Sequence, residues 1–195
     1  LGYGTLVVVT ALTGMQALDA LARRNLVAAD LDYTPYALQL TDSGQTAIID
    51  GEIGWKHYSA LIDALAADDH GIERIVLRSE GGLVLAARSL ASVVEQHDLD
   101  TFTDTSCYSA CTLVFVAGEE RWLVGDAELG FHQYKVVSPI QMSTFEPEHE
   151  QMIDQAYLRS RGVSQAFVDH AFQAAPDSMW LPDHRTLLVE GVLTR

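Results

Sequence analysis

Residues in the middle of the chain have the types and the order that acyl transfer requires. Ser109 lies at the centre of the segment 107–111, directly before a run of apolar residues. The pair Gly81-Gly82 comes earlier in the sequence, and His132 comes later. Acyl transfer needs a nucleophile, a base that takes its proton, and N–H donors for the oxyanion. A serine, a histidine and a flexible glycine turn supply these three parts.

Each of these residues also has an ordinary structural interpretation. A serine at the start of a helix commonly caps that helix, and a histidine at a strand end is often a satisfied core residue. A glycine pair often forms only a turn. The turn and the oxyanion role are compatible, because glycine has no Cβ to block the approach of a carbonyl to its N–H. We favour catalysis because Ser109, His132 and the glycines occur together.

The composition indicates a single globular domain with a short appendage. The chain has 195 residues, of which 48% are hydrophobic and 20% are charged, enough to build a real core. The formal net charge is −15, with no local stripe of Lys and Arg to offset it. Because phosphate contacts need a basic surface, we expect no nucleic-acid partner.

The two cysteines, Cys107 and Cys111, bracket Ser109. A zinc site needs about four ligands, and the sequence has no second cysteine pair and no His-Glu-x-x-His pattern. We therefore predict neither a metal site nor a cofactor. Two interpretations of the pair stay open at this point. In an oxidising compartment it would form a disulfide, and otherwise it would be two buried thiols that pack the turn.

The N-terminal part is a candidate membrane segment. The first 18 residues carry no charge, which is the lower limit for a membrane span, and Arg23-Arg24 follow. We interpret residues 1–27 as an apolar helix, either anchored in a membrane through residues 1–22 or buried against a partner. Residues 28–46 are expected to be a linker. An anchored domain would be membrane-associated or periplasmic, in a bacterial envelope.

From residue 47 onward, strands and helices are expected to alternate, which indicates an α/β domain with short parallel strands. Apolar residues recur at helical spacing in several segments and alternate with short β-branched runs. The expected strands are 47–53, 72–78, 100–104, 121–124, 128–132 and 191–193, and the expected helices are 58–65, 83–94, 109–117, 146–161 and 164–174.

This order of elements and motifs resembles the Clp protease proteolytic-subunit family, within the wider Clp/crotonase fold, over residues 47–195. Singly each motif is weak, but their order and spacing are typical of the fold. The motifs that carry the resemblance are Arg78-Ser79-Glu80-Gly81-Gly82, Ser109-Ala110, Ala117-Gly118 followed by Arg121, and Gly130-Phe131-His132-Gln133. The resemblance implies an α/β Clp/crotonase-like fold of repeated β-β-α units. It also implies a homo-oligomer, or a subunit of a larger complex.

The resemblance assigns a role to each candidate site residue. Ser109 would attack the carbonyl of a peptide or protein substrate, with His132 as the base. The N–H groups of Gly82 and Ala110 would bind the oxyanion. The family's acid comes late in the chain, where Asp177 fits best and Asp183 is the second choice. The implied activity is that of a serine endopeptidase, a hydrolase that works through an acyl-enzyme on Ser109.

Two departures from the family pattern leave alternatives open. Glu80 replaces a proline beside the glycine pair, and the cysteines around Ser109 resemble an exported or membrane-linked bacterial branch of Clp-like proteins. The first alternative is a catalytically inactive Clp-like subunit that binds or assembles within a membrane-associated complex. The second is a crotonase-type acyl-CoA enzyme, which would rely on oxyanion N–H groups and Glu residues such as Glu119 and Glu120.

Overall fold

The computed structural model describes residues 38–41, 43–67, 71–134 and 146–195. The expected apolar helix at 1–27 and most of the expected linker at 28–46 lie outside these residues. Within the described part, no helix has both the length and the apolar character that a membrane crossing requires.

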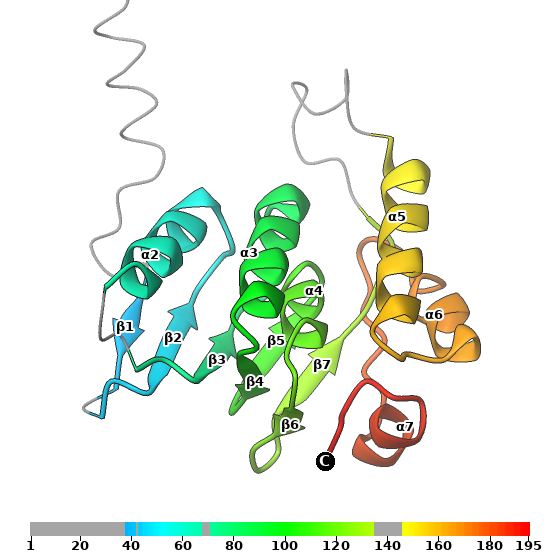
Figure 1. The fold of residues 1–195 in the computed structure, drawn as a ribbon. Coiled ribbons are helices and arrows are strands. Elements are labelled where there is room, and N and C mark those ends of the chain that lie inside the picture. The colour runs from blue at the N-terminus through cyan, green and yellow to red at the C-terminus, as the bar shows by residue number, and fades with distance from the viewer. Residues whose placement is uncertain (1–37, 42, 68–70, 135–145) are drawn as a thin grey trace, which may run out of the picture. The chain divides into compact units, whose positions relative to one another are not determined.

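The main sheet has five strands in the order β1-β2-β3-β4-β6 (Figure 1). The first strand, β1, pairs antiparallel with β2, and the other pairings are parallel. The middle of β3 is a β-branched and leucine run that is fully buried, as expected for a central parallel strand. The bounds are β1 Gln39–Leu40, β2 Thr46–Asp50, β3 Arg74–Arg78, β4 Asp100–Thr103 and β6 Arg121–Leu123.

A second, smaller sheet is formed by β5 (Ser106–Tyr108) and β7 (Glu128–Gly130), which run parallel. Isolated bridges extend this layer, pairing Ile53 with Gly82, Ser79 with Cys107, and Phe131 with Trp180. A strand of the main sheet is therefore followed by a segment of the second layer and then by a helix. This pattern recurs along the chain and places Ser79, Gly82 and Cys107 in one layer.

The helices pack on these sheets through apolar faces. In α3 the apolar residues at helical spacing, such as Ala86, Leu90 and Val94, are buried. In α4 every side chain is buried, which fits its wholly apolar sequence apart from one threonine. In α2 the apolar residues at helical spacing are only partly covered, because Leu61 and Leu65 are buried but Ile62 is exposed. Figure 1 shows α4 beside α3, with α5, α6 and α7 at the end of the sheet away from β1. The bounds are α2 Trp55–Leu65, α3 Val84–Gln96, α4 Cys111–Val116, α5 Pro147–Ser160, α6 Gln165–Ala171 and α7 His184–Val189.

The C-terminal region departs from expectation at one point. Ser164 caps α6 as predicted, because its side chain accepts a hydrogen bond from the N–H of Phe167. The strand expected at 191–193 is wrong: Val192 and Leu193 are buried, but the segment forms no ladder. Its apolar residues fill the core below α7, and the N–H of Thr194 donates to the Arg121 carbonyl at 3.0 Å.

Candidate active site

Ser109 stands in a turn with a backbone conformation that L-residues rarely adopt. It lies between β5 and α4 with φ 54°, and among the described non-glycine residues only Asp98 shares a positive φ. Such conformations persist only where the surroundings impose them. The Ser109 N–H donates to the Gly130 carbonyl at 2.8 Å, and the N–H and hydroxyl of Thr112 both donate to the Ser109 carbonyl. The turn is thus held from two sides.

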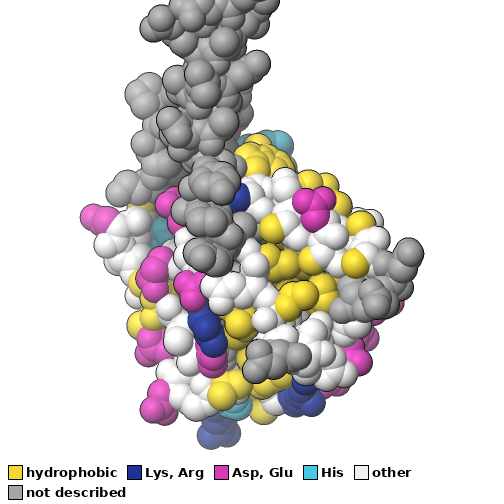
Figure 2. All heavy atoms as spheres, turned by 90° about the vertical axis from the view of Figure 1, so that its left-hand side faces the viewer, with side chains coloured by type: hydrophobic (Ala, Val, Ile, Leu, Met, Phe, Trp, Pro, Cys, Tyr) yellow, Lys and Arg dark blue, Asp and Glu magenta, His cyan; other side chains and the backbone are white. Residues whose placement is uncertain are grey.

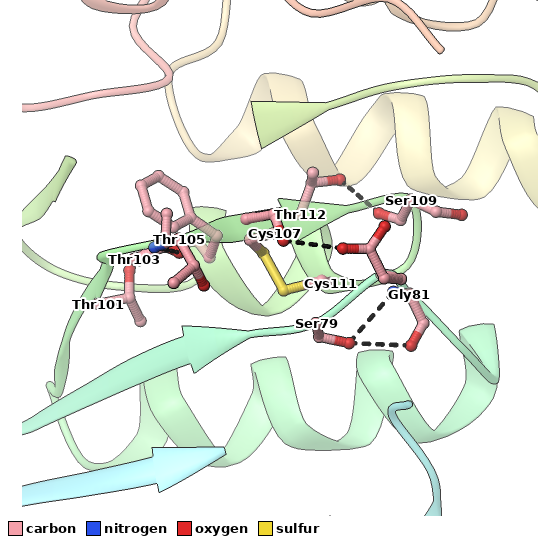
Figure 3. The surroundings of a disulfide bond; sticks show 12 residues. Ser79, Gly81, Thr101, Thr103, Thr105, Cys107, Ser109, Cys111 and Thr112 are labelled. Carbon is pink, nitrogen blue, oxygen red and sulfur yellow. Dashed lines mark hydrogen bonds between the residues drawn. A yellow bond between two sulfur atoms is a disulfide. The ribbon is translucent and has the colours of Figure 1, made fainter. Parts of the chain in front are cut away.

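A disulfide closes the same turn. Cys107, in β5, is bonded to Cys111, the first residue of α4, and both side chains are fully buried. Figure 3 shows this bond beneath the turn that carries Ser109, with Ser79 and Gly81 next to it. The sequence left a disulfide and two free thiols as alternatives, and the structure has the disulfide. Strand and helix are therefore covalently joined across the candidate nucleophile.

The glycine pair packs between Ser109 and the first β-β-α unit. A Cβ on Gly82 would come within 2.2 Å of the Ile53 carbonyl oxygen, and both glycines have positive φ, at 118° and 143°. Only glycine fits such a close approach in this backbone region. The N–H of Gly81 donates to the Ser79 hydroxyl at 3.1 Å. Among the described residues, no hydrogen bond uses the N–H of Gly82 or of Ala110, the two groups expected to bind the oxyanion.

His132 lines the same small cavity as Ser109. The cavity has a volume of about 10 Å³, room for about one water molecule. Its other walls are mainly apolar: Thr112, Leu113, Phe131, Tyr134, Leu158 and Phe172. The hydrogen bonds of the described residues include none between the Ser109 hydroxyl and the His132 ring. Catalytic hydrogen bonds are often long before substrate binds. The structure thus brings Ser109 and His132 to one cavity without a hydrogen bond between their side chains.

The backbone on either side of His132 is held by the late segment 174–180. Phe131 exchanges two backbone hydrogen bonds with Trp180, at 3.0 and 2.9 Å, and the N–H of Gln133 donates to the Ala174 carbonyl at 2.9 Å. Asp177 lies within this segment, between the two points of attachment. Its side chain is exposed and is not part of the cavity wall. The structure therefore brings the Asp177 loop alongside the His132 segment but leaves the carboxylate outside the cavity.

Asp183 has a different role in this structure. It precedes α7, and its carboxylate accepts a hydrogen bond from the N–H of Thr186 at 2.7 Å. This hydrogen bond lowers the pKa of Asp183 below its ordinary value. A carboxylate that caps a helix in this way is engaged in local structure.

Sequence reasoning missed a buried cluster next to the cavity. Asp154, in α5, is fully buried and forms a double hydrogen bond with Arg88 of α3. The hydroxyl of Tyr134, which lines the Ser109 cavity, donates to the same carboxylate. No signal in the sequence distinguishes Asp154, because the 146–161 segment contains several acids and its apolar pattern is weak.

The far end of α4 is held by two arginines. The side chain of Arg121 donates to the Val116 carbonyl at 3.0 Å, and that of Arg161 donates to the carbonyls of Ala117 and Gly118. Burial lowers the pKa of Arg121 from its ordinary value. Cations at a helix C-terminus offset the negative end of its dipole. Both ends of the short helix behind Ser109 are thus fixed.

A larger, open cavity of about 630 Å³ lies beside Gly82, at the carboxyl ends of β2 and β3. Its charged lining is mostly acidic, with Asp50, Glu52 and Glu80 against Arg78. Arg78 is already paired with Asp104 through two hydrogen bonds of 2.7 Å. A site for CoA phosphates needs free basic groups, so this lining argues against the crotonase-type alternative. Figure 2 shows further acidic side chains scattered over the β1 side of the molecule.

The described residues contain no group of three or more His, Cys, Asp or Glu placed to hold a metal ion. No protein-family profile matches the chain, and no curated protein sequence matches it. Solved structures do match. A mutant ClpP1 from Listeria monocytogenes superimposes with a TM-score of 0.61 at 15% sequence identity, covering 78% of this chain and 90% of that chain. At this identity the likeness concerns the fold, and it confirms the expected Clp protease-like fold.

Proposed function

We propose that the protein is a Clp-like serine peptidase that cleaves peptide bonds through an acyl-enzyme on Ser109. The observation that carries this proposal is the constrained turn, which presents Ser109 to the cavity that His132 also lines. A buried disulfide and three hydrogen bonds hold a strained serine conformation. An ordinary helix cap would need none of these constraints, because caps adopt unstrained extended backbone.

The chemistry would follow from the positions of these groups. His132 would take the Ser109 proton as the hydroxyl attacks the substrate carbonyl, and the N–H groups of Gly82 and Ala110 would bind the oxyanion. His132 would then give the proton to the leaving amine. Water would hydrolyse the acyl-enzyme by the reverse proton transfers. Asp177 would orient His132, which requires its exposed side chain to turn toward the His132 segment.

We further propose an envelope location for the protein, periplasmic or membrane-associated. The disulfide supports this, because such bonds persist in oxidising compartments. Anchoring through residues 1–22 is part of the same proposal and rests on the uncharged sequence alone. A peptide or protein substrate and a homo-oligomeric or multi-subunit assembly also remain proposals, supported by the Clp-like fold.

A second function has a specific observation in its favour. The Ser109 cavity has room for about one water, and Asp177 is exposed. Both would suit a Clp-like subunit that keeps the fold for binding or assembly and does not turn over substrate. The two proposals make opposite predictions for the reactivity of Ser109.

Intact-mass detection of fluorophosphonate labelling separates the two functions. We expect one adduct on the wild-type protein and none on Ser109→Ala. Ser106→Ala is the matched control, because Ser106 lies three positions away in β5 and its hydroxyl is engaged with Glu80. It should label as the wild type does. Absence of an adduct on wild-type protein with a native circular dichroism spectrum would rule out an activated serine and favour the assembly role.

A further inference from the structure

A buried charged cluster joins α3, α5 and the segment after β7. Arg88 contacts Asp154 through Nε at 2.7 Å and through Nη2 at 2.8 Å. The same guanidinium also binds the carboxylate of Glu150 and, at 3.0 Å, its backbone carbonyl. The Asp154 side chain is only 1% exposed. A carboxylate at such depth needs every available partner, because it has no water to replace one that is lost.

Tyr134 is a second partner of Asp154. Its hydroxyl donates to the carboxylate, and burial, followed by the charge of Asp154, raises the pKa of Tyr134 well above its ordinary value. The hydroxyl therefore stays protonated and remains a donor. The backbone N–H of Tyr134 also donates to the Gln151 side chain of α5 at 2.7 Å. Side chain and backbone of Tyr134 are thus both tied to α5.

This attachment lies two residues from His132. Tyr134 and His132 line the same cavity as Ser109. Phe131 before His132 is held by backbone bonds to Trp180, and Gln133 after it by a backbone bond to Ala174. The His132 segment is therefore held between the 174–180 segment and α5, and Tyr134 provides the attachment to α5.

We propose that Tyr134 is a positioning residue for His132, and that its hydroxyl acts through the buried Asp154 and Arg88. The inference rests on the proposed function, because it concerns the base of the same site. Without the hydroxyl, the Tyr134 ring loses its anchor on α5. The cavity wall and the His132 imidazole then shift relative to Ser109. Proton transfer is sensitive to such displacements, and one of about 1 Å costs up to about a hundredfold in rate.

The chain offers a matched control for this contact. Tyr157, in α5, donates its hydroxyl to the Glu95 carboxylate of α3 at 2.6 Å. It is a tyrosine–carboxylate bond that, like the Asp154 cluster, links α5 to α3, but Tyr157 is not part of the Ser109 cavity wall. Tyr134→Phe and Tyr157→Phe therefore remove the same chemical group, one next to His132 and one away from it.

The experiment compares wild type with these two variants by two measurements at one pH. The first is the NMR chemical shift of the His132 ring, assigned by its loss in a His132→Gln protein. The second is the rate of fluorophosphonate labelling. In Tyr134→Phe we expect the His132 ring signals to move and labelling to slow by about tenfold. In Tyr157→Phe we expect neither change, whatever each variant does to the melting temperature.

Unmoved His132 signals in folded Tyr134→Phe would overturn the inference. Equal movement in Tyr157→Phe would also overturn it, because the effect would then reflect loosening of α5 in general. If Tyr134→Phe does not fold, Arg88→Lys takes its place. It keeps the charge but loses the planar fork, and it should move the same signals. If the His132 signals move in Tyr134→Phe but the wild-type protein is never labelled, the result would support the inference and refute the peptidase function.

Discussion

Gly81 and Ser109 are in direct contact, although they come from separate β-β-α units. A Cβ built on Gly81 would lie 2.9 Å from the Ser109 Cβ and 3.2 Å from the Tyr108 carbonyl oxygen. Real Cβ atoms do not approach so closely, so any other residue at position 81 would push the Ser109 turn away. Through this contact, Gly81 helps to hold the turn that carries Ser109, the proposed nucleophile.

Replacement of Gly81 should therefore lower the reactivity of Ser109. We expect Gly81→Ala to reduce fluorophosphonate labelling by at least about tenfold and to lower the free energy of unfolding by about 1–3 kcal/mol. Urea denaturation and labelling rates provide the two measurements. Gly125→Ala is the control, because Gly125 also has positive φ but nothing within 4 Å of its would-be Cβ. A Gly81→Ala protein that labels at the wild-type rate would contradict this role.

Removal of the disulfide should lower both stability and the reactivity of Ser109. Cys107 and Cys111 are only four positions apart, and closing so short a loop contributes about 2 kcal/mol on the chain-entropy model. We expect the double variant Cys107→Ala and Cys111→Ala to lose about that much stability. Its labelling should fall by more than about tenfold, because the turn is released. Wild-type protein treated with reductant should lose labelling in the same way and should regain it on reoxidation. Full labelling of the double variant would show that the disulfide is not needed to hold the Ser109 turn.

Substitutions of Asp177 and Asp183 should have different effects on labelling. Asp177→Asn is expected to slow labelling by at least about a hundredfold if Asp177 orients His132, since loss of the acid from such a triad costs up to about 10⁴. Asp183→Ala should leave labelling unchanged and lower the melting temperature slightly, because it removes the cap of α7. Wild-type labelling in Asp177→Asn would remove this residue from the site.

The Arg78–Asp104 pair should make the free energy of unfolding depend on pH in the acidic range. The Arg78 hydrogen bond holds the pKa of Asp104 below its ordinary value of 3.8. A lowered folded-state pKa contributes stability that is complete above the unfolded-state pKa and is lost as the pH falls through the folded-state value. We expect Asp104→Asn to cost about 0.5–1 kcal/mol at pH 7, because the pair is partly exposed.

Unfolding of wild type and Asp104→Asn in urea, at neutral and acidic pH, checks this expectation. The difference in unfolding free energy should shrink as the pH drops below about 4. A difference that stays constant down to about pH 2 would show that the pair is not coupled to the Asp104 proton.

The sequence by itself determined the order and type of most elements. Apolar spacing in 83–94, β-branched runs such as 72–78, and the capping serine at position 164 are local signals, and the structure confirms each of them. The motif order also predicted the Clp-like fold, and with it that Ser109 and His132 would come together. The glycine pair of that motif order is a local signal too, because the positive φ of Gly81 and Gly82 selects glycine.

Only the tertiary structure decided which distant side chains meet. The bond between Cys107 and Cys111 was one of two alternatives in the sequence, and it forms because the strand and the helix start bring the two Cα atoms to 5.3 Å. The buried Asp154 was indistinguishable from its acidic neighbours until α5 packed against Arg88 and Tyr134. Burial and long-range pairing depend on how segments pack in space, and the periodicity of the sequence does not show which distant segments will meet.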